Sequence, residues 1–277
     1  MDDKLSAMSK KSKKNKVSQD RPPENIFNVA FAIGVPLLGA LFLGQAIIGL
    51  SGASDGSLAS SSIVLAGLGL ISMFYGMQKY GTGGMGLRGG RPMFAGLGFT
   101  FLGWVAILIL RIFYIDIDEG SLLVQALSPI FFYLLIFEAF AVQLWAFSLV
   151  FKSVSDMWGG LTAAVVSGLL FAGVAFFFFQ EARFLEPLFG SVWLTIVAIL
   201  YMATWGILYG MIRLRTGSIL GIVIVQAMQS LTVWELIPPF EIINETNYNP
   251  LFFTVTGIFY AVLIWRLWPT ELDDYRI

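Results

Sequence analysis

Five polar side chains stand inside otherwise apolar stretches of this sequence, where they could bind a ligand or one another. Glu138 and Gln143 fall in one stretch, and Gln226, Gln229 and Ser230 fall in another. At 1.5 Å per helical residue, Glu138 lies about 20 Å from the basic residue that closes its stretch. Gln226 and Ser230 have the i, i+4 spacing that places two side chains on one helix face. A carboxyl group at that depth in a membrane is protonated or faces a polar partner, so these five residues form the candidate binding site.

The residue types that the sequence lacks restrict the chemistry further. It contains no histidine and no cysteine. These absences exclude the common zinc sites, histidine–serine dyads, histidine-ligated haem and cysteine nucleophiles. We therefore expect no metal and no cofactor, and any chemistry must use carboxylates, amides and hydroxyls.

The composition predicts that lipid surrounds most of the chain. Hydrophobic residues make up 57% of the 277 residues and charged residues only 13%, with a mean hydropathy of +0.79. A soluble domain carries about 25% charged residues. We therefore predict an all-α integral membrane protein. Because most lysines crowd near the N-terminus, no basic surface remains to follow a phosphate backbone, and we expect no nucleic-acid binding.

A bilayer core takes about 20 apolar residues in a helix, and the sequence contains about eight stretches that meet or approach that length. The predicted spans are, in chain order, 26–50, 62–79, 92–113, 123–150, 160–179, 190–212, 217–236 and 250–268. They form a membrane domain over residues 26–268, between a disordered lysine-rich cytoplasmic tail (1–25) and a short cytoplasmic tail (269–277).

The charges predict the orientation of these spans. With the N-terminus inside, 15 of the 17 basic residues fall in inside segments, and only Arg111 and Arg183 fall outside. This division follows the positive-inside rule. We predict a multi-pass protein of a bacterial inner membrane, with both termini in the cytoplasm.

A glycine-rich segment connects the second and third spans. Residues Gly81–Gly86 read G-x-G-x-x-G, which cradles phosphate only between a strand and a helix. Because this segment lies between two predicted membrane helices, we interpret it as a flexible cytoplasmic turn.

A second turn carries a family resemblance. The segment Gly206–Leu220 reads G-x-x-x-G-x-x-R-x-R-T-G-S over its first thirteen residues, with Arg213 and Arg215 at a helix end and Gly217 as the expected stop. This segment resembles the helix–turn–helix of the CAAX-protease and bacteriocin-processing family, also called Abi or CPBP. The resemblance implies a CPBP-like helical bundle with its core at about residues 123–236.

In that family, three helix motifs assemble a site whose glutamate and histidines are thought to activate water against a peptide bond. Here Glu138 matches the first acid and Phe171 matches the second motif. The other positions differ: Ala139 stands for the second acid, Gln143 for the arginine, Ala175 for a histidine, and Gln226 and Ser230 for the histidine and asparagine of the third motif. Neither alanine nor glutamine can act as a general base, so the resemblance implies the fold without the catalytic site.

Three functions remain open. The leading hypothesis is a catalytically inactive family member that acts as a subunit, scaffold or assembly factor for a membrane protein complex, or holds a lipid or pigment. Its expected partners are membrane lipids and another integral membrane protein. The first alternative is an intramembrane endopeptidase that acts through Glu138. The second is a lipid or small-solute transporter, although no inverted repeat is evident in the sequence.

Overall fold

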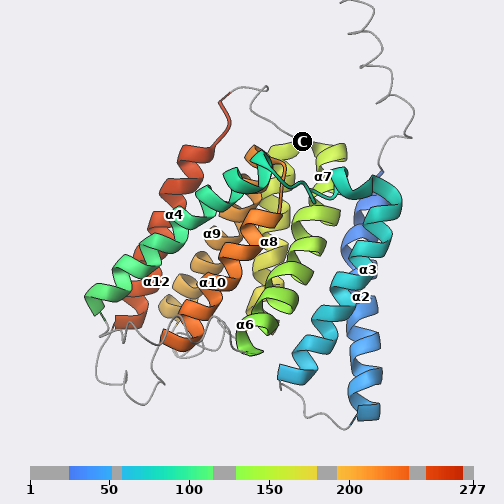
Figure 1. The fold of residues 1–277 in the computed structure, drawn as a ribbon, viewed down its shortest axis with the longest axis horizontal. Coiled ribbons are helices and arrows are strands. Elements are labelled where there is room, and N and C mark those ends of the chain that lie inside the picture. Colours follow the sequence, from blue (N-terminus) through green and yellow to red (C-terminus); the bar gives the residue numbers. More distant parts are fainter. Residues whose placement is uncertain (1–24, 52–57, 115–128, 180–191, 237–247, 271–277) are drawn as a thin grey trace, which may run out of the picture.

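A computed structural model describes residues 25–51, 58–114, 129–179, 192–236 and 248–270 (Figure 1). All secondary structure in these residues is helical. The elements are α2 (Ile26–Ser51), α3 (Leu58–Gly84), α4 (Arg91–Tyr114), α6 (Pro129–Tyr133), η1 (Leu134–Ala141), η2 (Leu144–Val150), α7 (Phe151–Trp158), α8 (Gly160–Phe178), α9 (Val192–Thr216), α10 (Leu220–Leu236) and α12 (Tyr248–Leu267). Most of the two predicted tails lies outside the described residues, which include only residue 25 of the first tail and residues 269–270 of the second. The first residues of two predicted spans, 123–128 and 190–191, also lie outside the described residues.

The apolar helices confirm the prediction of an α-helical membrane protein. Within the described residues, five segments are long and apolar enough to cross a membrane: Ile26–Leu50, Ser60–Gly84, Ile130–Trp158, Gly160–Phe178 and Val192–Thr216. Two shorter apolar segments are also helical, Leu220–Leu231 and Phe253–Leu267. Each of the predicted stretches therefore contains a helix, and the structure supports a multi-pass membrane protein.

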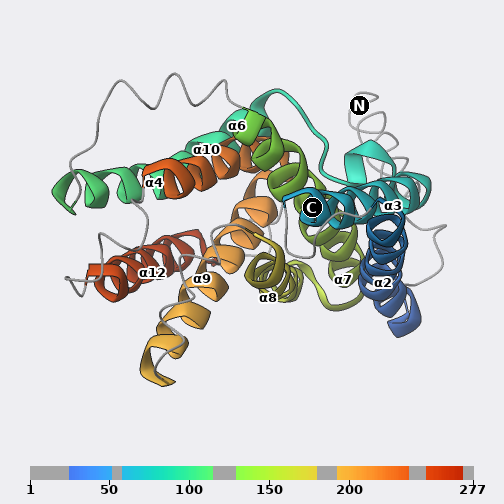
Figure 2. The same cartoon turned by 90° about the horizontal axis from the view of Figure 1, so that it is seen from below.

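One continuous helical rod occupies the centre of the bundle. It runs from Pro129 to Trp158 through α6, η1, η2 and α7. In its most apolar stretch of 18 residues, 78% of the stretch is buried, whereas in the corresponding stretch of α2 only 22% is buried. The α2–α3 hairpin packs against one side of the rod. On the other side α10 packs on α4, and α12 packs on α9, so that the rod and α8 lie between two outer groups of helices (Figure 2).

Small residues allow α8 and α9 to approach closely. Gly206 of α9 faces Gly168 of α8, and Gly210 faces Ala164. At both glycines of α9 an added Cβ would overlap a backbone carbonyl oxygen of α8. This is the small-xxx-small pairing typical of membrane helices. The G-x-x-x-G part of the predicted signature therefore forms a helix crossing.

Two helix ends have local causes in the sequence. The N–H of Asn28 donates to Asn25 Oδ1 at 2.9 Å, which caps the start of α2. Gly217 has φ +70, and its N–H donates to the carbonyl of Arg213 at 2.9 Å, which ends α9. The predicted stop at Gly217 is thus confirmed.

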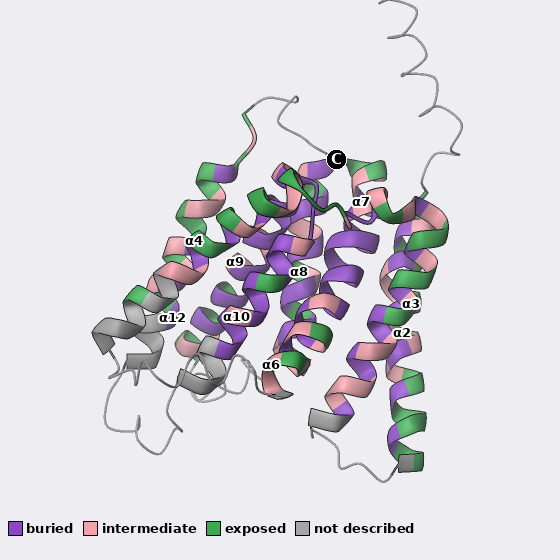
Figure 3. Cartoon of the chain, viewed as in Figure 1, coloured by how far each residue is buried: buried purple, intermediate pink, exposed green. Residues whose placement is uncertain are grey.

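Burial follows the arrangement of the bundle (Figure 3). Most of the largest fully buried side chains come from the rod, α8 and α9, among them Trp145, Trp205 and Phe171, and the others come from α3 and α12. The faces of the helices that point away from the rod expose apolar side chains, among them Phe42 of α2 (72%) and Trp193 at the start of α9 (70%). Exposed apolar surface of this kind is expected where lipid is the solvent.

Candidate functional site

The backbone that carries Glu138 is π-helical, and Gln143 lies between two π-helical segments. Glu138 lies in η1, and Gln143 lies at the junction where η2 begins. Runs of i→i+5 hydrogen bonds are rare and occur frequently at functional sites. The sequence alone gives no local signal for this geometry, because the apolar residues around Glu138 suit an ordinary α-helix equally well.

The side-chain amides of two predicted site residues bind each other. Gln143 Nε2 donates to Gln226 Oε1 at 2.6 Å. Gln226 Nε2 in turn donates to the backbone carbonyl oxygen of Glu138 at 3.2 Å. All three residues are fully buried. The structure therefore brings Glu138, Gln143 and Gln226 together, with α10 bound to the π-helical rod through neutral hydrogen bonds.

The remaining two predicted residues lie one helical turn further along α10. Gln229 accepts a hydrogen bond through its Oε1 from the hydroxyl of Tyr209 on α9, at 3.1 Å. Ser230 is also buried, and its hydroxyl has no hydrogen-bond partner among the described residues. Tyr209 was missed by sequence reasoning. Its place in the G-x-x-x-G helix is the only signal that could have drawn attention to it.

Aromatic rings fill the interior around Phe171. The ring of Phe171 lies 5.3 Å from Phe147, 5.3 Å from Trp205 and 5.8 Å from Tyr209, measured between centroids. Ala175, one helical turn further along α8, is fully buried. Aromatic contacts of this kind stabilise a core beyond the area they bury. The region is therefore packed as an apolar core, with Tyr209 linking it to the amides.

This arrangement favours holding helices together over proton transfer. Amide groups donate and accept hydrogen bonds but do not accept protons at neutral pH. Glu138 is the only carboxyl group among the five residues. No cluster of three or more His, Cys, Asp or Glu side chains suited to a metal occurs in the part of the chain that the structure describes.

A second polar centre lies at the end of the bundle where α9 stops. Arg213 is 3% exposed. Its Nε donates to the carbonyl of Phe147 in η2 at 2.9 Å, and its Nη2 donates to the carbonyl of Gly84 at 3.2 Å. The guanidinium also lies 5.2 Å from the ring centre of Phe151. One arginine therefore joins α9, the π-helical rod and the end of α3.

Neighbouring residues of the same turn bind two more segments. Arg215 Nε donates to the carbonyl of Leu267 at 2.9 Å, and Nη2 donates to the carbonyl of Trp268 at 3.1 Å, at the end of α12. The hydroxyl of Ser218 donates to the carbonyl of Arg88 at 2.7 Å. The Arg-x-Arg-Thr-Gly-Ser turn is thus a structural clasp for this end of the bundle.

The glycine-rich segment takes part in the clasp. Gly86 has φ +72, its carbonyl accepts a hydrogen bond from the N–H of Ile219 at 3.0 Å, and a Cβ at this position would lie 2.5 Å from Arg213 Cζ. The predicted turn begins later than expected, because Gly81–Gly84 form the last residues of α3, which is kinked at Gly81 (φ +67), and only Met85 and Gly86 lie in the turn that leads to α4. The glycines of the segment allow the close approach of Arg213.

No family model matches this chain, and neither does any curated protein or any solved structure.

Replacing Gly86 by alanine is expected to destabilise the protein more than the same change at Gly90. Both glycines have positive φ, which costs an L-residue about 1–2 kcal/mol. Only at Gly86 does the added methyl group also displace Arg213, whereas at Gly90 it meets open space. Thermal unfolding of both variants in detergent measures the difference. Equal losses would show that Arg213 does not depend on contact with Gly86.

The hydrogen bond between Gln143 and Gln226 predicts that substitutions of the two residues have non-additive effects on the free energy of unfolding. Gln143→Leu leaves Gln226 Oε1 without its donor, so we expect a loss of about 1–2 kcal/mol in the free energy of unfolding. Adding Gln226→Leu removes the stranded group, so the double variant should lose less than the sum of the two single losses. Denaturant unfolding of the three variants measures the coupling. A strictly additive result would mean that the two amides do not interact.

Proposed function

We propose that this chain is a catalytically silent member of the CPBP family that serves as a subunit, scaffold or assembly factor of a larger membrane protein complex. The observation that carries the proposal is the closed amide pair of Gln143 and Gln226. These residues occupy the positions of the arginine and a histidine in the family's motifs. Here they bind each other, and Gln226 also binds the backbone of Glu138, which is a structural use of those positions.

The topology proposed with this function has eight spanning helices and cytoplasmic termini in a bacterial inner membrane. Helices α4, α10 and α12 occupy the predicted spans beyond the five that already satisfy length and composition. Arg111 lies near the far end of α4. The other seven basic residues of the described ranges also support this topology, because they lie in or beside the segments that hydrogen bonds join at the end of the bundle where α9 stops. They are Lys79, Arg88, Arg91, Lys152, Arg213, Arg215 and Arg266. This end is the cytoplasmic one under the positive-inside rule.

The burial of the site indicates where a partner binds. Glu138, Gln143 and Gln226 have no exposed surface, and Gln229 has 1%. A ligand reaches them only if the helices separate, whereas the outer helices expose large apolar side chains directly. An integral membrane protein is therefore the partner that fits this surface best, beside the membrane lipids themselves.

Purification in a mild detergent tests the proposal. We expect the tagged full-length chain, expressed at its native level, to elute in a complex with one integral membrane protein at a fixed stoichiometry. Mass spectrometry of the eluted complex measures that ratio. Recovery of the chain alone, at the mass of its monomer and without a bound partner, would contradict the proposed role.

The protease alternative rests on Glu138 within a π-helical segment, since such segments recur at functional sites. Glu138→Gln separates the two functions. A scaffold keeps its partner after this change, because the amide preserves the shape of the side chain. A glutamate-dependent peptidase loses processing of its membrane substrate, which accumulates at full length. We expect partner recovery to be unchanged and no uncleaved precursor to accumulate.

A further inference from the structure

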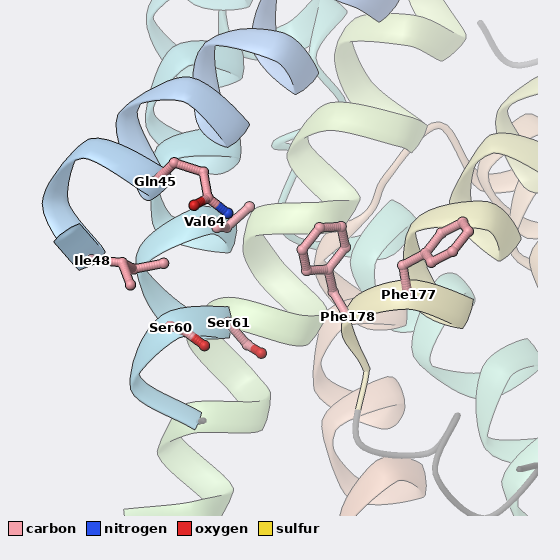
Figure 4. A pocket seen from close by; sticks show the side chains of 7 residues that line it. All are labelled: Gln45, Ile48, Ser60, Ser61, Val64, Phe177 and Phe178. Carbon is pink, nitrogen blue, oxygen red and sulfur yellow. The ribbon is translucent and has the colours of Figure 1, made fainter. Parts of the chain in front are cut away.

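A pocket lies at the end of the bundle away from the clasp, between the α2–α3 hairpin and α8. Its volume is about 230 Å³, and it is lined by Gln45, Ile48, Ser60, Ser61, Val64, Phe177 and Phe178 (Figure 4). The polar side chains come from α2 and α3, and the aromatic rings come from the last turn of α8. Phe177 is 78% exposed, so this wall of the pocket faces outward from the bundle.

The position along the helices places the pocket near the surface of the hydrocarbon layer. Gln45 lies six residues before Ser51, where α2 ends, which is about 9 Å along the axis. The 26 residues of α2 measure about 39 Å, against about 30 Å for a hydrocarbon core. Gln45 is therefore about 5 Å inside that core. Ser60 and Ser61 follow the start of α3, and Phe178 ends α8, so all three walls lie at similar depth.

The polar groups of the pocket are neutral and can donate hydrogen bonds. Gln45 is exposed and Ser61 is partly exposed. Neither side chain forms a hydrogen bond with the described residues. An amide that faces lipid without a partner is costly. Gln45 Nε2 and the hydroxyl of Ser61 therefore require acceptors. None of the lining residues is charged, so nothing here attracts a phosphate group.

We propose that this pocket binds the ester-linked glycerol region of a membrane lipid. Its ester carbonyls are hydrogen-bond acceptors at the surface of the hydrocarbon core, near the level of Ser61 and within reach of the Gln45 side chain, and they match the donors of these two residues. The first methylenes of the acyl chain pack against Ile48, Val64 and the phenyl rings. A volume of 230 Å³ holds about seven groups the size of a water molecule, which suits one ester with a few methylenes. The bound lipid covers the exposed amide and fills the space between the hairpin and α8.

Native mass spectrometry of the full-length protein tests this site with two synthetic lipids. One is a diacyl phosphatidylcholine, and the other is the dialkyl ether of identical head group and chain length, which lacks the carbonyls. We expect the protein to retain the diacyl lipid about fivefold more strongly, the effect of about one hydrogen bond. A diacyl phosphatidylglycerol should be retained as well as the phosphatidylcholine, because the pocket does not contact the head group.

Substitutions of residues that line the pocket test whether the pocket causes the preference for the ester lipid. Gln45→Leu combined with Ser61→Ala should remove the preference for the ester lipid. Gln78→Leu is the matched control, because Gln78 is an exposed glutamine of α3 outside the pocket, and this variant should retain the preference. Equal retention of both lipids by the native chain would overturn the proposal. So would a preference that survives in the double variant, or one that follows the head group. Loss of a dimer in the double variant without any change in lipid retention would assign the pocket to a second copy of the chain instead.

Discussion

The bundle should lose its native packing when Gly210 of α9 is replaced by leucine. An added Cβ at this position overlaps the carbonyl oxygen of Ala164 on α8, which is backbone and cannot rotate away. Helices α8 and α9 must then move apart, and this separates the aromatic core around Phe171 and Trp205. Overpacking of this kind costs about 3 kcal/mol or more. We expect a large drop in the unfolding temperature in detergent, with aggregation on size-exclusion chromatography.

Gly173 provides the matched control on α8. It is exposed, and an added Cβ there meets nothing within 4 Å. Gly173→Leu should leave the unfolding temperature unchanged or slightly higher, because leucine has the greater helix propensity. Gly206→Leu should behave like Gly210→Leu, since its Cβ would overlap the carbonyl of Gly168. If the variants at Gly210 and Gly173 unfolded at the same temperature, the close crossing of α8 and α9 would be wrong.

Hydropathy predicts the helices of this chain well because a membrane helix depends on the local sequence. The apolar stretches become helices near their predicted bounds, and Gly217 ends α9 as its left-handed conformation requires. Burial of the five polar residues also follows from depth alone, and all five are buried. These properties depend on residues that are near one another in the chain.

The partners of the polar residues depend on distant backbone and could not be predicted in the same way. Gln226 binds the carbonyl of Glu138, and Arg213 binds the carbonyls of Phe147 and Gly84. Carbonyl groups are present in every residue, so no sequence pattern distinguishes the ones that are bound. The π-helical geometry could not be predicted for the same reason. Side chains from α9 and α10, which are distant in the sequence, bind the backbone of η1 and η2.

Arg213 illustrates why the resemblance to a protease signature is compatible with a structural role. The Arg-x-Arg-Thr-Gly-Ser turn binds the ends of α3 and α12 and the π-helical rod, and none of these contacts involves a reacting group. Such a turn can therefore stabilise a bundle whether or not the bundle carries a catalytic site. The turn by itself implies no activity, because the function depends on the residues of the site.

Replacing Arg213 by lysine or leucine tests this structural role, and we expect a graded loss of stability. The guanidinium reaches two carbonyls through separate N–H groups, whereas a single ammonium group lacks that planar fork. Arg213→Lys should lower the free energy of unfolding by about 1–2 kcal/mol. Arg213→Leu leaves both carbonyls without a donor and should cost about 3 kcal/mol.

Arg91 is the matched control, because it is an exposed arginine at the same end of the bundle. Arg91→Lys and Arg91→Leu should each change the stability by about 0.5 kcal/mol or less. Thermal unfolding of the four variants in one detergent measures the contrast. If Arg213→Lys were as stable as the native chain, a point charge would suffice at this position. The paired hydrogen bonds to η2 and α3 would then have no special role in holding the clasp.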